Sequence, residues 1–294
     1  MKKIKFVLMS MVAALLVSCG TTSTVPITGR KQNLMVSDGE MLSLSTQQYQ
    51  EFMKTAKVST DATKTAMVKR VGQNLANAVV SYLNANGMQN DVQNYKWQFN
   101  LVADKQANAW CMPGGLIVVY EGLLPITQDE ASLAIVLGHE IAHAVARHSA
   151  EQMSQQIKQQ YGVQGLSALA SVLGVGSNTI SMGQAMASAG INLFNLKYSR
   201  NHESEADYMG LIFAAMAGYN PESAVTFWQR MSAASTNNTS EFLSDHPSDA
   251  TRIKNIQGWL PEAKKYYKPK TTTTAKKTTT TKKKTTTKKT TKKK

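Results

Sequence analysis

The sequence predicts a helix-rich α+β fold with a small β-sheet, and two kinds of periodicity support this. Apolar residues recur at helical spacing over Met67–Leu83 and again over about Arg200–Ala217. Between them, Tyr95–Val102 alternates apolar and polar side chains, as a half-buried strand does. With 42% of its 294 residues hydrophobic, the chain has room for a sizeable core and is not wholly disordered.

Two strands are predicted before residue 121. The helix over Met67–Leu83 ends near Asn86-Gly87, and Tyr95–Val102 follows as the first strand. Leu116–Tyr120 is a short β-branched run bounded by glycines, which is typical of a second strand.

Further helices are predicted after residue 126. Thr127 and Glu130 have the T-x-x-E spacing of a capping box, which predicts a long helix through His148. The helix over Arg200–Ala217 stops at Gly218, and Asn220-Pro221 supplies a cap and a first-turn proline for the next helix. Residues 162–190, rich in small side chains and methionine, are expected to form loosely packed helices or a cover over a site.

The net charge of +14 belongs to the C-terminal tail. Residues 264–294 hold 14 lysines and no acid, so the rest of the chain sums to zero, and residues 19–263 alone carry −3. A nucleic-acid-binding core is therefore disfavoured. The Lys/Thr tail is expected to be disordered, serving as a solvated spacer or binding anionic lipid or envelope polymers through salt-sensitive attraction.

The N-terminus has the layout of a secretory signal. Three lysines precede an apolar run over 6–17, which is short for a membrane-spanning helix. The sequence then reads Leu16-Val17-Ser18-Cys19, which resembles a bacterial lipobox whose cysteine is acylated. Cys19 is therefore predicted as a lipidation site in the bacterial periplasm, with the outer membrane favoured over the inner. Cys111 then has no partner for a disulfide.

The sequence accordingly predicts four segments. These are a lipoprotein signal peptide at 1–18, a tether at 19–37, a main domain at 38–263 and the tail at 264–294.

Chemistry is concentrated in His139-Glu140-Ile141-Ala142-His143, on the helix predicted to begin at the capping box. Positions i and i+4 lie on one helix face, so both imidazoles can reach one metal ion. Glu140 is rotated about 100° from His139, which places a carboxylate beside the metal rather than on it. This arrangement suits Zn²⁺ and the deprotonation of a water that it activates.

The second long helix offers the remaining parts of such a site. Glu203 and Asp207 are again four residues apart, and a catalytic zinc commonly takes two histidines and one glutamate. We predict Glu203 as the third ligand and Asp207 as the carboxylate that orients a ligand imidazole. Glu205 points about 200° away from Glu203 on the helix and is a poor ligand.

Several separated motifs together resemble the HtpX-like and CAAX-prenyl-protease-like zinc metalloendopeptidases, metallopeptidase family forty-eight, particularly a soluble periplasmic branch. The resemblance covers about residues 25–260. It rests on the segments Val25–Arg30, Asn108–Gly115, Leu133–His148, Tyr198–Asp207 and Asp245–Ser248, the last leading into Arg252-Ile253. The Lys/Thr tail departs from the family pattern.

The resemblance implies a zincin-like core with the small sheet beside the His-Glu-x-x-His helix. It implies one Zn²⁺ per chain on His139, His143 and Glu203, with Glu140 as general base and acid and Asp207 supporting the ligands. It also implies an edge strand that pairs with extended substrate, here predicted at Gly115, Leu116, Ile117 and Val118. A plain structural hairpin is the alternative for this strand.

Two residues near the C-terminus are assigned looser roles. His246 is predicted either to fill the open coordination position as a removable plug or to hydrogen-bond the transition state. Arg252 is predicted to contact substrate or a carboxylate.

Other candidates are expected to be structural. His148, nine residues after His139, should face nearly opposite to His143 on a continuous helix, and His202 should project away from the site. Cys111 is expected to fill core space, and Met182 and Met186 to line a soft core or a lid.

The predicted function is a zinc-dependent endopeptidase for unfolded or misassembled cell-envelope proteins. The first alternative is an envelope chaperone or assembly factor with a latent zinc site. A second is a polyanion-binding lipoprotein that depends on the tail.

Overall fold

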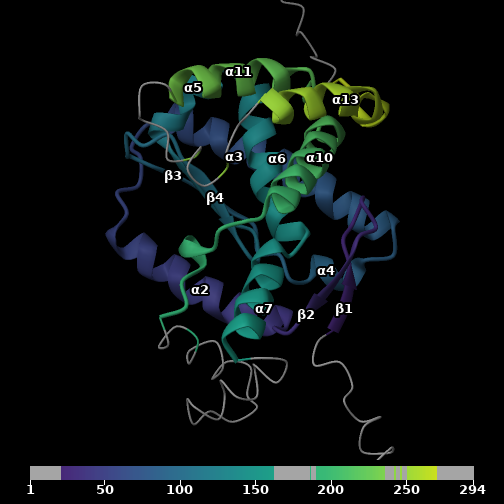
Figure 1. Ribbon diagram of the computed structural model, residues 1–294. Helices are drawn as coiled ribbons and strands as arrows, with labels where there is room; N and C mark the ends of the chain where they lie inside the picture. Colours follow the sequence, from purple (N-terminus) through teal and green to yellow (C-terminus); the bar gives the residue numbers. More distant parts are fainter. Residues whose placement is uncertain are drawn as a thin grey trace, which may run out of the picture.

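The computed structural model describes residues 21–161, 186, 190–235, 242, 246 and 250–269. Its centre is formed by helices α6 (Glu130–Val145) and α10 (Arg200–Met216), which lie against each other beside a three-stranded sheet (Figure 1). Helices α11 (Ser223–Ser235) and α13 (Ala250–Tyr266) lie at one end, and α2 (Asp38–Thr55) and α7 (His148–Tyr161) at the other. This arrangement confirms the predicted helix-rich α+β class.

The tether prediction for residues 19–37 is wrong for its described part. Strands β1 (Thr21–Thr24) and β2 (Lys31–Leu34) pair as an antiparallel hairpin, with Thr21 opposite Leu34. Val25, in the turn, is 1% exposed within the main core. The apolar side chains at Val25 and Leu34 therefore bind this segment to the domain instead of leaving it in solvent.

Helix α3 (Ala62–Ala85) confirms the first predicted helix and extends it at both ends. The Asp61 side chain accepts the Lys64 N–H and caps its start. Its buried face holds the apolar residues that the periodicity selects, namely Val68, Val71, Leu75, Val79 and Leu83. The short helix α4 (Gln89–Val92) follows.

The sheet has the order β3-β5-β4, with β3 at Gln98–Val102, β4 at Ala109–Met112 and β5 at Leu116–Tyr120. β5 is central, parallel to β3 and antiparallel to β4. Ile117 faces the larger core and Val118 the smaller one on the opposite face. Both faces of β5 are thus covered, which explains its continuous apolar sequence.

The predicted capping box at Thr127 and the single helix through His148 are both wrong. Thr127 ends the short helix α5 (Leu124–Thr127), which follows the 3-10 turn η1 (Glu121–Leu123). Asp129 caps α6 by accepting the Ser132 N–H at 2.7 Å. α6 ends at Val145, and Arg147 has a left-handed backbone with φ 56°, so α7 starts in a new direction.

Two ion pairs hold this break in place. The Arg147 guanidinium donates to Asp38 at 2.8 Å and to Asp91 at 2.9 Å. These contacts join the end of α6 to the start of α2 and to α4. They stabilise a left-handed backbone conformation at Arg147 that residues other than glycine rarely adopt.

α6 and α10 approach closely through glycines. A Cβ on Gly210 would lie 2.6 Å from the His139 backbone nitrogen, and one on Gly138 would lie 2.7 Å from the Gly210 carbonyl oxygen. The helix that bears the two histidines therefore contacts the helix that bears Glu203 through backbone atoms.

The C-terminal part departs from prediction in two places. α11 begins at Ser223, two residues after Pro221, although Asn220 still accepts the Glu222 N–H at 3.0 Å. α13 runs to Tyr266, so the predicted domain end at residue 263 lies inside this helix.

The 3-10 turn η2 (Leu193–Asn195) precedes α10. The expectation for residues 162–190 falls almost wholly outside the described residues, as does Met182, whereas Met186 is buried in the smaller core. The signal peptide, Cys19 and residues 270–294 of the tail also lie outside them. Among the residues that are described, no helix combines the length and apolarity needed to cross a bilayer.

Candidate active site

Four buried side chains from three parts of the chain converge beside the α6–α10 contact. His139, His143, Glu203 and His246 each direct one donor atom into a group whose atoms all lie within 4.8 Å of one another. His139 Nε2 and His143 Nε2 are 3.1 Å apart, and Glu203 lies 3.5 and 3.3 Å from them. The structure thus brings together the three predicted ligands and also His246, which one of its two predicted roles places at the open coordination position.

The distances and protonation of this group fit a metal ion. Ligand atoms at 2.0–2.1 Å from a tetrahedral zinc are about 3.4 Å apart. The contacts between neighbouring donor atoms here run from 3.0 to 3.5 Å, in a group whose atoms all lie within 4.8 Å of one another. Burial lowers the pKa of His143 well below its usual range. The hydrogen bond to Glu203 acts in the opposite direction but is outweighed, so the ring is neutral. Burial raises the pKa of Glu203, but hydrogen bonds to His139, His143 and His246 outweigh it and keep the carboxylate charged.

Asp207 lies where the sequence predicts. Its Oδ1 is 2.9 Å from His139 Nδ1, and because a carboxylate only accepts, this contact places the ring proton on Nδ1. Nε2 is then free to bind a metal. Burial opposes charge on His139, but the bonds to Asp207 and Glu203 outweigh it and raise the pKa of the ring.

Arg252 contacts a carboxylate, which is one of its two predicted roles. It is not among the residues that line the groove beside Glu140, which is described below. It is 6% exposed, donates to Asp207 at 2.6 Å and to the His246 carbonyl oxygen at 3.1 Å, and lies 3.6 Å over the Trp228 ring. It is therefore buried behind the ligands, and the predicted contact with substrate is not supported by this placement.

Glu140 lies beside the donor group. It is buried, and its Oε1 is 3.6 Å from His246 Nε2. Its position next to the histidines, and outside the set of four donors, is the one that the helical spacing predicts for a general base.

A groove of about 460 Å³ runs past Glu140 and His246. β4 forms one side and the segment around η2 the other, with Trp110 and Phe194 among the lining residues. Since β5 is hydrogen-bonded on both sides, the predicted substrate positions Leu116, Ile117 and Val118 are not on an edge strand, and Gly115 lies in the turn before it. Within the described part of the chain, β3 and β4 are the two outer strands of this sheet, and of these β4 (Ala109–Met112) is the edge strand that lines the groove.

His148 is the residue that the sequence interpretation places wrongly. Because of the break at Arg147, its Nδ1 lies 2.9 Å from His143 Nδ1 and its ring is fully buried. On a continuous helix the two rings would diverge. No spacing in the sequence indicates the break, since Ala146-Arg147 resembles ordinary helical sequence.

Beyond His148 lies a charged network. Glu205 is 3.0 Å from His148 Nε2 and accepts the Arg30 Nε–H at 2.8 Å. Arg30 also donates to Glu151, which lies 3.2 Å from His202. His202 is buried, lies outside the donor group and stacks on His148 with ring centroids 4.5 Å apart.

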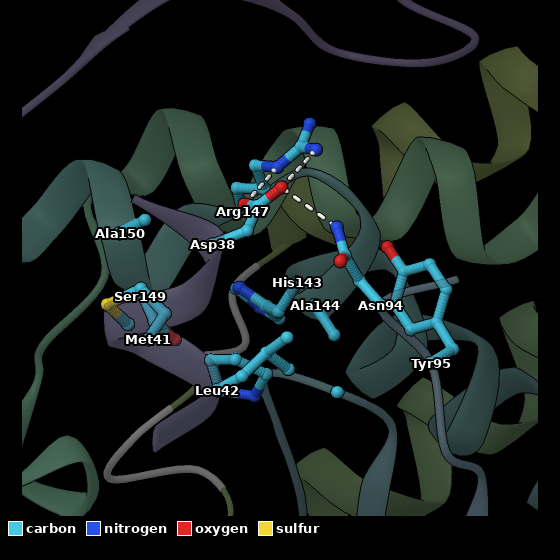
Figure 2. A pocket seen from close by; sticks show the side chains of 12 residues that line it. Asp38, Met41, Leu42, Asn94, Tyr95, His143, Ala144, Arg147, Ser149 and Ala150 are labelled. Carbon is cyan, nitrogen blue, oxygen red and sulfur yellow. Dashed lines mark hydrogen bonds and ion pairs between the residues drawn. The ribbon is translucent and has the colours of Figure 1, made fainter. Parts of the chain in front are cut away.

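On its other side His143 borders a small pocket between α2 and α6. Figure 2 shows Arg147, Asp38 and Asn94 linked across the rim of this pocket, with His143, Ala144 and Leu42 on its walls. The Tyr198 ring stacks on His143 at 4.1 Å, so the imidazole plane is fixed by packing.

Cys111 is buried, and burial raises the pKa of its thiol well above the usual range. Such a thiol is a poor nucleophile, in agreement with its predicted role as core filler.

Comparisons with known proteins identify relatives of this chain. Mitochondrial metalloendopeptidase OMA1 of Schizosaccharomyces pombe is 37% identical over 172 residues, covering 58% of this chain and 48% of the relative. The OMA1 metalloendopeptidase of Bos taurus is 32% identical over 248 residues, covering 82% and 46%. The beta-barrel assembly-enhancing protease of Yersinia pestis is 28% identical over 180 residues, covering 58% and 36%. The chain spans half or less of the length of these relatives.

The profile of Peptidase family M48 matches residues 62–260, which include both ligand-bearing helices and the sheet. The zincin-like α+β core and the metal-binding character that the sequence motifs imply agree with this match. The chain therefore belongs to Peptidase family M48.

Proposed function

We propose that this protein is a zinc-dependent endopeptidase of the bacterial cell envelope. The observation that carries the proposal is the convergence of His139, His143 and Glu203 with Glu140 beside them. The donor set of two imidazoles and one carboxylate is the one that catalytic zinc commonly takes. The names of the bacterial relatives, which include assembly-enhancing proteases, support an envelope location.

Glu140 is assigned the proton transfers. When bound, Zn²⁺ supplies Lewis-acid polarisation of the scissile carbonyl and lowers the pKa of the attacking water to near 7. Glu140 accepts the proton of that water as it adds to the carbonyl carbon, and then delivers the proton to the leaving amine. Asp207, which Arg252 holds in place, keeps His139 in the tautomer that leaves Nε2 unprotonated.

Substrate is proposed to bind as an added strand on β4. The free edge of Ala109–Met112 borders the groove that holds Glu140, and an edge strand offers N–H and C=O groups to any extended peptide. Backbone recognition suits unfolded or misassembled envelope proteins, which expose extended segments.

The test uses the protein from residue 20 onward and unfolded casein as substrate. Wild-type protein should cleave casein, a chelator should abolish cleavage and added Zn²⁺ should restore it. Glu140→Gln should retain zinc and the wild-type circular dichroism spectrum but lose activity by at least a hundredfold. Turnover by Glu140→Gln at the wild-type rate would remove the general-base assignment.

A latent form is the second candidate, because His246 lies within the donor group. Its Nδ1 is 3.0 Å from Glu203 and 3.1 Å from His139 Nε2. We assign His246 as a plug that holds the site inactive, which is compatible with an additional chaperone or assembly role. His246→Ala should then cleave casein faster than wild type, whereas slower cleavage would assign His246 to transition-state binding instead.

Cys19 is proposed as the lipid-anchored residue, with the outer membrane favoured, on the lipobox-like sequence alone. Labelling with a radioactive fatty acid should mark wild-type protein and not Cys19→Ser.

A further inference from the structure

We infer that His148 is a positioning residue that sets the tautomer of the metal ligand His143 and thereby the affinity for the ion. This inference rests on the proposed metal site at His139, His143 and Glu203. The observation behind it is a chain of contacts between two carboxylates through two imidazoles. It runs from Glu203 to His143 at 3.3 Å, from His143 to His148 at 2.9 Å and from His148 to Glu205 at 3.0 Å.

The direction of each hydrogen bond follows from the last link. A neutral His148 carries one ring proton, and because Glu205 only accepts, that proton is on Nε2 and Nδ1 is left with a lone pair. That lone pair faces His143 Nδ1, which must therefore carry the His143 proton. His143 Nε2 is then unprotonated and points at the donor group.

The number of protons in this row of contacts, from Glu203 through His143 and His148 to Glu205, explains why it favours a bound cation. The two neutral imidazoles carry two ring N–H protons between them, while each of the three contacts in the row needs a proton or a cation. The two protons satisfy the contacts of His148 with Glu205 and with His143. The contact between His143 Nε2 and Glu203 is left to a metal ion, which satisfies it without adding charge to either ring.

The surroundings of His148 fix it in this role. Its ring is fully buried and stacks on His202, and Glu205 is held by Arg30 at 2.8 Å and by the Thr28 hydroxyl. Arg30 and Thr28 come from the β1–β2 turn, so the N-terminal hairpin secures the far end of the chain. The break at Arg147 brings His148 to His143. The roles assigned above to the catalytic residues do not explain why a buried histidine contacts His143 on the side away from the metal site.

The test compares three variants with the wild-type protein, titrated with Zn²⁺ against a competing chelator. His148→Leu removes the acceptor at similar bulk and should weaken zinc binding by 10- to 100-fold. His148→Asn places an amide oxygen near the position of Nδ1 and should restore binding to within about threefold of wild type. Ser154→Ala deletes a buried hydrogen-bonding side chain from the same helix α7, bonded to the Met35 N–H and not to His148, and should leave zinc affinity within about threefold.

A second readout follows the hydrogen bond itself. In ¹H–¹⁵N spectra of the zinc-loaded protein, the His143 Nδ1–H should give a downfield, exchange-protected resonance in wild type and in His148→Asn. His148→Leu should lose that protection even where zinc is saturating.

The inference is overturned if His148→Leu binds zinc as tightly as wild type with the resonance unchanged. It is equally overturned if Ser154→Ala weakens binding as much as His148→Leu, because the effect would then be general to this part of the core. A wild-type protein that binds no zinc would instead refute the proposed metal site.

Discussion

At the scale of single residues, Arg252 neutralises the buried carboxylate that orients His139. It donates to Asp207 at 2.6 Å, and both side chains are almost fully buried. Removing one partner of a buried pair leaves an uncompensated charge, which costs far more than the pair contributes.

We therefore expect Arg252→Met to lower the free energy of unfolding by about 3–5 kcal/mol. Arg252→Lys should cost less, since it keeps the charge. The matched control is Lys54→Met, whose exposed pair with Glu51 should contribute less than about 1 kcal/mol. Chemical denaturation measures all three, and an Arg252→Met effect as small as the control's would show that the pair is unimportant.

Glu151 predicts a loss of stability in acid. Burial raises the pKa of this carboxyl, but hydrogen bonds from His202 and Arg30 outweigh it and lower the pKa to about 2 from 4.5. The unfolded chain then binds the proton first as pH falls, so stability present above pH 4.5 is lost between about pH 4.5 and 2.

Glu151→Gln should reduce this acid-dependent loss by on the order of 1–2 kcal/mol after allowance for solvent screening. Denaturation midpoints measured at pH 6, 4 and 3 give the slope for both proteins. Equal slopes would mean that Glu151 has the same proton affinity folded and unfolded.

What the sequence could reveal at this scale depended on local geometry. His139 with His143, and Glu203 with Asp207, lie four apart on single helices, and helical spacing alone aligns each pair. His148 could not be placed in this way, because its contact with His143 needs the left-handed Arg147. Arg252 meets Asp207 across 45 positions of sequence, a distance over which local periodicity carries no information.

At the scale of elements, the crossing of α6 and α10 determines how the ligands meet. The two helices touch through Gly138 and Gly210, and a Cβ on Gly210 would lie 2.6 Å from the backbone nitrogen of His139. Since backbone atoms cannot rotate out of the way, a larger residue must push the helices apart.

Gly210→Ala should therefore lower stability by about 1–3 kcal/mol and weaken zinc binding, because Glu203 would move away from the histidines. The control is Gly258→Ala, in the exposed part of α13 with no atom near the added Cβ, which should raise stability by about 0.5–1 kcal/mol. Thermal unfolding and zinc titration of the two variants test this. Unchanged zinc affinity in Gly210→Ala would mean that the crossing tolerates a methyl group.

Elements themselves were predicted more reliably than their ends. The periodicity of α3 and α10 was clear because each buries one continuous face. The start of α6 was misplaced because Thr127 and Asp129 are both good caps, and only the fold shows that α5 already uses Thr127. The sheet order was also out of reach, since strand alternation does not say which strand is central.

At the scale of the whole molecule, the lysine tail and the folded domain are expected to be separable. α13 ends at Tyr266 and Ala263 is buried, so a truncation that respects the fold follows Pro269. The protein ending there should cleave casein at the wild-type rate. Binding to vesicles with anionic lipid should fall and lose its salt dependence. Loss of casein cleavage on truncation would favour a polyanion-dependent function instead.

If Cys19 carries the proposed lipid, the N-terminal hairpin would hold the folded domain close to the membrane. β1 starts at Thr21, so a single residue, Gly20, separates it from Cys19, and the extended chain from Cys19 to Thr21 spans at most about 7 Å. An acylated Cys19 would thus anchor the domain through a very short linker. The folded domain could rotate about this anchor but could not move away from the bilayer. Its substrates would then be confined to polypeptides that emerge at, or are stalled against, the lipid surface.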